Sequence, residues 1–366
     1  MPFADELIGR DVALQLRQSL RAVVPAAEFS ALALAADALA DLSLRERADV
    51  LRDAILADVP GDYAVLARTV RAARDRDPEF TGWMIWPVTS AVATRGVGEG
   101  TDAFDDAMQL LAELTGRLTA EFAIRILLRH DLDRALATML AWTGSPDEHV
   151  RRLASVGARP YLPWAVRVPG ILARSGATIP ILDALYRDDS EYVRRSVANH
   201  LNDLSRDHAD LVVETAERWN EAGTASTPAL VRHALRTLVK RGDPGALAVL
   251  GFAPANIEID GPHLDRTVVD WSGEVRFSAV LRNAGAETAR IAVDYVVHHR
   301  RANGRLAAKV FKLTTAELAP GEERRVERTH SFRPITTRRY YPGEHGIALQ
   351  VNGTATPLVA FDLQPE

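Results

Sequence analysis

The chain has 366 residues, of which 47% are hydrophobic and 25% charged, and its net charge is −5. This balance is typical of a folded protein and excludes a largely disordered chain. The sequence contains no cysteine, which excludes disulfides, thiol nucleophiles and cysteine-ligated metals. No apolar run reaches the roughly 20 residues that cross a bilayer, and the first residues lack the pattern of a secretory signal. The sequence therefore predicts a cytoplasmic protein without a membrane partner.

The first 250 residues have the pattern of successive helices. Apolar residues recur at helical spacing from Val12 to Val23, and Ser43 with Glu46 forms a capping-box pattern ahead of the next apolar stripe. Further helices are predicted over residues 62–74, 102–116, 119–129 and 131–142. The stretch 78–101 contains Pro87 and a cluster of Gly96, Gly98 and Gly100, and it is predicted to be a connector with one short helix.

A motif then recurs about every 40 residues. The segments SPDEHVRRLAS, DDSEYVRRSVA and STPALVRHALR align on Val150, Val193 and Val231, which are 43 and 38 residues apart. A two-helix unit of this length is typical of HEAT-like repeats, which bury a core only by stacking. The sequence predicts a HEAT-like repeat α-solenoid over residues 1–252.

After Gly251 the chain changes to short β-rich segments separated by turn signals such as Asn303-Gly304 and Pro342-Gly343. Strands are predicted over residues 275–280, 289–297, 306–313, 324–332, 346–351 and 358–363. About 110 residues of this kind are typical of an immunoglobulin-like β-sandwich. The predicted fold is therefore mainly α, with the solenoid followed by a C-terminal β-sandwich over residues 256–366.

The ends of the repeat helices carry charged and aromatic residues. Equivalent ends of successive helices line one concave face of an α-solenoid, so we expect these residues to meet in one groove. Arginines at the rim, with an aromatic residue and a carboxylate between them, suit a DNA duplex. The residues expected there are Arg152, Arg159, Trp164, Arg194, Arg195 and Asp203.

Three long motifs resemble one known family. They are SVGARPYLPW, EYVRRSVANHLNDLSRDH and, in the predicted sandwich, ITTRRYYPGEHGIALQVNG. Together they resemble the AlkC branch of the AlkC/AlkD DNA alkylation repair proteins, and the resemblance covers nearly the whole chain. It implies a DNA glycosylase that excises cationic alkylated bases, 3-methyladenine above all, from duplex DNA. It also implies a solenoid groove that holds the damaged duplex while the sandwich closes over its other side.

The resemblance implies site residues as well. Glu121 in TAEFAIR and Asp203 in LNDLSRDH match acidic positions of the family and would be catalytic, and Trp164 matches the aromatic residue beside the damaged nucleotide. An alkylated purine is already cationic and leaves without a general acid. The reaction then needs a stabilised sugar cation and a positioned water, which carboxylates supply. An aromatic face also favours positive charge. No cofactor is expected.

One position departs from the family pattern. The family has Ala-Ser-Glu-Gly where this chain has Ala154-Ser155-Val156-Gly157, so an aliphatic side chain replaces an expected carboxylate. Two functions stay open: a glycosylase with lowered or re-targeted activity, and a non-catalytic binder of alkylated or distorted DNA. A HEAT scaffold for protein partners is a third alternative, which a positive groove would argue against. The expected state is a monomer.

Several of these residues also have a purely structural interpretation. Asp203 and Glu121 stand where helix-capping acids are common. Trp164 is of a residue type that is more often packed in a core or between domains than bound to a ligand. The arginines of the repeats either contact phosphate or join neighbouring repeats. In the sandwich, Arg338 and Arg339 precede Tyr340 and Tyr341 and are predicted to contact DNA. The histidines 298, 299 and 330 do not predict a metal site, because adjacent residues on a strand point to opposite faces.

Overall fold

The computed structural model describes residues 4–336 and 338–365, and the chain divides into two compact units. The first consists of Met1–Val212 and Trp219–Ala234, and the second of Val213–Arg218 and Leu235–Glu366. Among the described residues, no helix is both long and apolar enough to cross a membrane.

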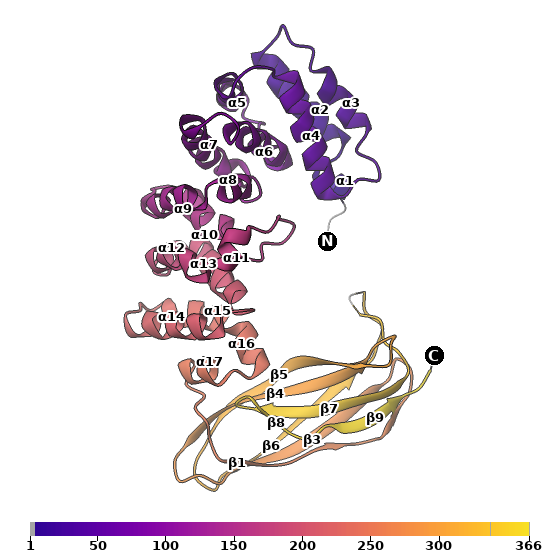
Figure 1. The fold of residues 1–366 in the computed structure, drawn as a ribbon. Coiled ribbons are helices and arrows are strands. Elements are labelled where there is room, and N and C mark those ends of the chain that lie inside the picture. Colours follow the sequence, from indigo (N-terminus) through magenta and orange to yellow (C-terminus); the bar gives the residue numbers. More distant parts are fainter. Residues whose placement is uncertain (1–3, 337, 366) are drawn as a thin grey trace. The chain divides into compact units, whose positions relative to one another are not determined.

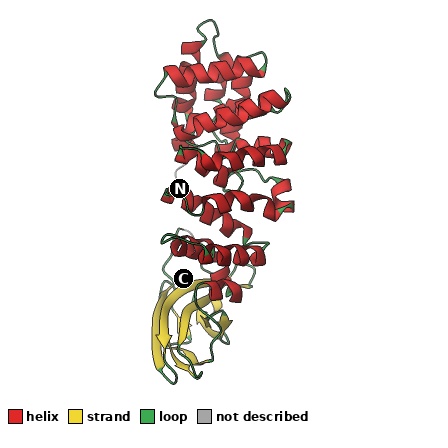
Figure 2. Ribbon diagram, turned by 90° about the vertical axis from the view of Figure 1, so that its left-hand side faces the viewer, coloured by secondary structure: helices red, strands yellow, loops and turns green. Residues whose placement is uncertain are grey.

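Helices build the first unit, apart from Val213–Arg218 in the middle of one of them, and Figure 2 shows the helices stacked in successive tiers. Short 3-10 turns lie at Gly82–Met84, Thr115–Arg117, Trp142–Gly144 and Ser175–Thr178. The α-helices, labelled in Figure 1, are α1 (Ala4–Leu7), α2 (Arg10–Val23), α3 (Ser30–Asp37), α4 (Leu44–Asp58), α5 (Tyr63–Arg76), α6 (Ile85–Gly96), α7 (Thr101–Leu114), α8 (Ile124–His130), α9 (Leu132–Ala141), α10 (Glu148–Gly157), α11 (Pro169–Ala173), α12 (Ile179–Leu185), α13 (Glu191–Leu204), α14 (Ala209–Glu221) and α15 (Thr227–Ala234).

The tiers form two rows of helices. In one row α4 packs on α6 and α6 on α8, and α10 packs on α13 and α13 on α15; in the other, α5 contacts α7 and α9 contacts α12. The recurring Val-Arg motif falls in α10, α13 and α15, and its valines Val150, Val193 and Val231 are buried in the stack. The prediction of a HEAT-like α-solenoid is confirmed.

Two helix predictions differ from the structure. The stretch predicted as a connector contains α6, whose residues are nearly all buried. A helix buried on every side has no polar face, so it lacks the 3.6-residue alternation by which helices are recognised. The helix predicted over 119–129 begins only at Ile124, and Glu121 lies in a turn before it.

The second unit contains a β-sandwich, as predicted, together with two short helices, α16 (Arg236–Arg241) and α17 (Pro244–Val249). One sheet has the order β1-β3-β6 and the other β2-β9-β7-β4-β5, with β8 pairing to β7. The strands are β1 (Ile257–Leu264), β2 (Val268–Val269), β3 (Glu274–Asn283), β4 (Ala289–Arg300), β5 (Leu306–Leu318), β6 (Glu323–Ser331), β7 (Gly343–Val351), β8 (Thr354–Ala355) and β9 (Val359–Leu363).

The sandwich core lies between its sheets, where Phe277, Tyr295 and Phe361 pack with aliphatic side chains. The helices α16 and α17 are joined closely to this unit. A Cβ on Gly242, which has a φ of +74°, would lie 2.8 Å from the backbone oxygen of Gly353 in the β7–β8 turn. Only glycine allows both the left-handed backbone and this close approach.

Candidate functional site

Helix α10 positions the centre of the predicted site. The Asp147 side chain caps its N-terminus by accepting a hydrogen bond of 2.8 Å from the His149 N–H. The helix ends at Gly157, where a Cβ would lie 2.8 Å from Ile124 Cγ2 of α8. The close packing against α8 therefore fixes where α10 stops and where the following segment, residues 158–168, begins.

Asp203, near the end of α13, is held by Arg159, which directly follows α10. Arg159 donates from Nε and Nη2 to the two carboxylate oxygens at 2.9 and 3.1 Å. The exposed fractions of the two side chains are 14% and 7%, so the pair is largely shielded from solvent. A bidentate pair of this kind fixes the carboxylate plane. Asp203 therefore does not cap a helix, and Arg159 is already engaged by a carboxylate.

Glu121 is held by Arg152 through a single hydrogen bond. The Arg152 guanidinium donates to Glu121 Oε2 at 3.0 Å, and the Thr119 hydroxyl donates to the same oxygen at 3.1 Å. Arg152 also lies over the Tyr192 ring, 4.8 Å from its centroid. Both predicted catalytic carboxylates thus receive an arginine from α10 or its exit, so the α10 stretch links them.

Val156 lies between the two arginines in sequence. It is one helical turn beyond Arg152, on the same face of α10, and three residues before Arg159. Its side chain is only 2% exposed. The departure from the family pattern therefore places a buried aliphatic group on the helix that, with the residues directly after it, pairs with both carboxylates, and an aliphatic side chain neither orients water nor balances charge.

Trp164 is exposed, with 47% of its surface accessible, in the segment between α10 and α11. Its φ of +60° is unusual for a bulky residue, so the surrounding structure holds it there. Its backbone oxygen accepts a hydrogen bond from Arg45, and its ring lies 6.5 Å from Trp83 between centroids. Trp164 is therefore not a core residue, and the first helices of the chain help to place it.

Arg125 is a buried residue that the sequence analysis missed. Its side chain is fully buried and donates from Nη1 to the oxygens of Gly157 and Arg159, both at 2.9 Å, and from Nε to the oxygen of Val166. Burial, followed by the nearby Arg167 and Arg159 charges, lowers the pKa of Arg125 to about 10. Arg125 thus joins the two ends of the segment that carries Trp164. A lone arginine in a helical pattern gave no signal of this role.

His200 of α13 fixes the end of α10 from the other side. Its imidazole is fully buried between the Ser155 backbone oxygen, 2.7 Å from Nδ1, and the Thr178 hydroxyl, 3.0 Å from Nε2. Burial lowers the pKa of His200 to about 4. The neutral ring therefore donates from Nδ1 to Ser155 and accepts from Thr178.

The two arginines of the α13 motif differ in their surroundings. Arg194 donates to the backbone oxygens of Asp188 and Asp189 at 2.6 and 2.8 Å, just before its own helix. Arg151 of α10 donates to the Ser145 backbone oxygen in the same way. Arg195 is exposed, and no described residue forms an ion pair with it. Both line a pocket of about 530 Å³ between α13 and α15. Arg195 is the one of the two whose charge remains available to a ligand.

The predicted contact residues of the sandwich lie over a buried histidine cluster. Arg338 lies 2.8 Å from His299 Nε2, and Arg339 lies over the Tyr341 ring, 5.5 Å from its centroid. Burial lowers the pKa of His299 to about 3 and that of His330 to about 4. His299 is therefore neutral and accepts the hydrogen bond from Arg338. Among the described residues, no group of three side chains is arranged to hold a metal.

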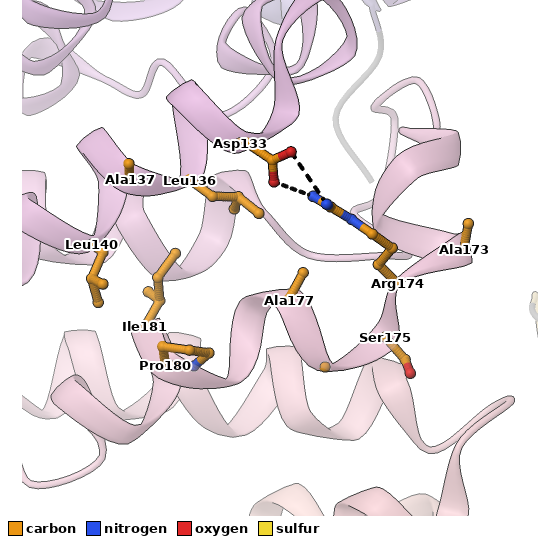
Figure 3. A pocket seen from close by; sticks show the side chains of 11 residues that line it. Asp133, Leu136, Ala137, Leu140, Ala173, Arg174, Ser175, Ala177, Pro180 and Ile181 are labelled. Atoms are coloured by element: carbon orange, nitrogen blue, oxygen red, sulfur yellow. Dashed lines mark hydrogen bonds and ion pairs between the residues drawn. The ribbon is translucent and has the colours of Figure 1, made fainter.

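A further pocket of about 580 Å³ lies between α9 and the α11–α12 region (Figure 3). Asp133 and Arg174 face one another at this pocket and form an ion pair of 2.5 Å. None of the predicted site residues lines it. It therefore offers matched control residues for tests of the site.

Comparisons with known proteins agree on one family. Residues 113–238 match the model of the DNA alkylation repair enzyme family, and residues 258–365 match that of the C-terminal Ig-like domain of YhaZ. The chain is 33% identical to the uncharacterised protein YhaZ of Bacillus subtilis over 88% of each chain. It is 34% identical to the Pseudomonas fluorescens alkylpurine DNA glycosylase AlkC, solved bound to DNA containing an abasic site analog. That match covers all of both chains with a TM-score of 0.84.

The matches to YhaZ and to AlkC extend over the solenoid and the sandwich. Their sequence identities of 33% and 34% indicate a family relationship and not only a shared fold. The chain belongs to the DNA alkylation repair enzyme family and is of the AlkC type.

Proposed function

We propose that the protein is a monofunctional DNA glycosylase, which removes cationic alkylated bases of the 3-methyladenine class from duplex DNA. The observation that carries the proposal is the bidentate Arg159–Asp203 pair beside the segment that presents Trp164. Family membership and the likeness to an alkylpurine glycosylase support it.

The chemistry requires little of the protein beyond placement. The N-glycosidic bond breaks, the cationic base leaves as a neutral molecule, and positive charge develops on the sugar. Asp203, oriented by Arg159, and Glu121, oriented by Arg152, would stabilise that charge. Water then adds to the sugar carbon and its proton passes through a carboxylate to solvent. Trp164 would lie against the damaged nucleotide, where its ring favours a cation.

A second candidate is a protein that binds alkylated or distorted DNA without excising the base. Val156 favours it, because the position where the family pattern has a glutamate is aliphatic and buried in this chain. Both carboxylates are also already paired with arginines, so the two pairs carry no net charge. The two candidates predict the same binding and differ in whether a base is released.

The test measures release of 3-methyladenine and binding to the same methylated duplex. Asp203→Asn should lower the rate of release by at least about 100-fold, the range typical of a lost charge-stabilising group, with binding nearly unchanged. The matched control is Asp133→Asn, which removes an acid from an arginine pair outside the site and should leave both measurements unchanged. Equal release by Asp203→Asn and the unaltered chain would exclude this site.

A further inference from the structure

The segment between α10 and α11 carries a cationic cluster that the site does not use. The guanidinium carbons of Arg167 and Arg206 lie over the Tyr161 ring, 4.9 and 4.3 Å from its centroid. Tyr161 and Arg167 stand three residues before and after the exposed Trp164, while Arg206 comes from the turn after α13. Two stretches of the chain therefore place two positive charges on one aromatic ring, beside Trp164.

Neither guanidinium group forms an ion pair with a described carboxylate, although one carboxylate, Asp207, lies at the hydroxyl end of the same ring. Arg167 donates to the Leu162 backbone oxygen at 3.2 Å, and in residues 4–336 and 338–365 neither arginine forms an ion pair. Asp207, the acid next to Arg206, accepts a hydrogen bond from the Tyr161 hydroxyl. Both guanidinium groups are exposed. Many other arginines of this unit, such as Arg71 and Arg134, are paired with carboxylates.

The surroundings add to the excess of positive charge. Arg125 lies beneath the same segment and bonds only backbone oxygens, and the Arg167 charge is one cause of its lowered pKa. Arg45 donates to the Trp164 oxygen. The buried acid Asp203 is already paired with Arg159. Two guanidinium groups beside one carboxylate leave this surface with an excess of positive charge, which suits an anion.

We propose that Tyr161, Arg167 and Arg206 form a clamp for backbone phosphates of the DNA strand next to Trp164. Guanidinium groups stacked on a ring keep their N–H edges free, and those edges match a phosphate in two-pronged geometry. Tyr161 preorganises the two side chains, which lowers the entropy lost on binding. The assignment rests on the proposed function in DNA, and it concerns three residues to which the family resemblance assigned no role.

The test is the salt dependence of binding to a fluorescent duplex that contains an abasic-site analogue, followed by anisotropy across a series of KCl concentrations. Each lost phosphate contact lowers the slope of log affinity against log salt by about 0.9. Arg167→Gln with Arg206→Gln should lower the slope by about 1 to 2. Tyr161→Phe keeps the ring and should bind as the unaltered chain does, whereas Tyr161→Leu should bind more weakly.

The control removes the same amount of charge elsewhere. Arg134→Gln with Arg174→Gln takes away two exposed arginines that are paired with Asp105 and Asp133, and its slope should match that of the unaltered chain. A slope unchanged in the Arg167/Arg206 variant, or lowered equally in the control, contradicts the clamp. An unaltered chain that shows no salt-dependent DNA binding contradicts the proposed function itself, so the two failures are distinguishable.

Discussion

The solenoid and the sandwich bury polar groups in different ways. In the solenoid the buried acids are paired with arginines, as in Asp203–Arg159, and Arg125 has one nitrogen, Nη2, without a hydrogen-bond partner. In the sandwich the unpartnered buried atoms are imidazole nitrogens, His299 Nδ1 and His330 Nε2, among aromatic rings. The solenoid therefore buries permanent charge, and the sandwich buries groups that are neutral only above a certain pH. Substitutions that remove a buried charge should therefore lower the stability of the first unit, and acid should lower the stability of the second unit most strongly.

Removing the Arg125 side chain should have the largest effect on stability. Arg125→Met leaves the backbone oxygens of Gly157, Arg159 and Val166 without this donor, so we expect a loss of about 3–5 kcal/mol, since each unsatisfied buried acceptor costs about 1–3 kcal/mol. The midpoint of urea unfolding, followed by the helical circular dichroism signal, measures this loss. Protection of β4 and β7 from hydrogen exchange should not change. A loss below about 1 kcal/mol would show that the segment is held without Arg125.

Acid should destabilise the sandwich next most strongly. His299 and His330 have folded pKa values of about 3 and 4, lowered by burial, against about 6.5 in an unfolded chain. Because the unfolded state binds the protons more tightly, the stability is fully present above pH 6.5 and is lost as the pH falls toward 4. The loss should be about 1.4 kcal/mol per pH unit for each histidine.

Hydrogen exchange of the backbone amides of β4 and β7, measured from pH 7 to pH 5, reports this loss of stability within the sandwich. His330→Phe should reduce the pH dependence by about half, because the ring fits its aromatic neighbours without titrating. The solenoid has a counterpart in His200, whose pKa is lowered to about 4. A steeper loss in the solenoid than in the sandwich would contradict the comparison.

Within the solenoid, a neutral buried contact should matter less than the buried charge. Ser155 of α10 donates to the Ser196 hydroxyl of α13 at 2.6 Å, and both residues are buried. Ser155→Ala should lower the free energy of unfolding by about 1–2 kcal/mol, since it leaves Ser196 unpaired. The double variant with Ser196→Ala should lose less than the sum of the two single changes. Additive losses would mean that the two hydroxyls do not interact.

The smallest effect on stability is expected for an exposed ion pair. Asp133 and Arg174 are 80% and 47% exposed at the pocket of Figure 3. Arg174→Gln should change the free energy of unfolding by less than about 0.5 kcal/mol, because solvent screens such pairs. The same urea measurement checks this. A loss comparable to that of Arg125→Met would show that the degree of burial does not govern these charges.

Much of the fold was predictable from sequence because its signals are local. The Val-Arg motif gives the repeat, and turn pairs such as Asn303-Gly304 separate the strands. The extent of α6 escaped prediction, where only one short helix was expected, because burial on all sides removes its polar face. The strand β1 escaped because Asp260, Gly261 and Pro262 interrupt its pattern, although β1 pairs with β3 on both sides of that irregularity.

The site was predictable in its residue types but not in its pairings. Glu121, Asp203 and Trp164 follow from motif resemblance, yet Arg159 bonds Asp203 across 44 residues and Arg152 bonds Glu121 across 31. These separations are of the order of one repeat, so the register between stacked helices decides which arginine meets which acid. The clamp residues Arg167 and Arg206 meet on Tyr161 for the same reason, and neither stands in a recurring motif.

The most direct test of the account is single-turnover release of 3-methyladenine from methylated duplex DNA, by the unaltered chain and by Val156→Glu. The account predicts that the unaltered chain releases the base, at a rate that Val156→Glu raises or leaves unchanged. Release only by Val156→Glu, with equal binding by both proteins, would contradict it and identify the chain as a binder of damaged DNA.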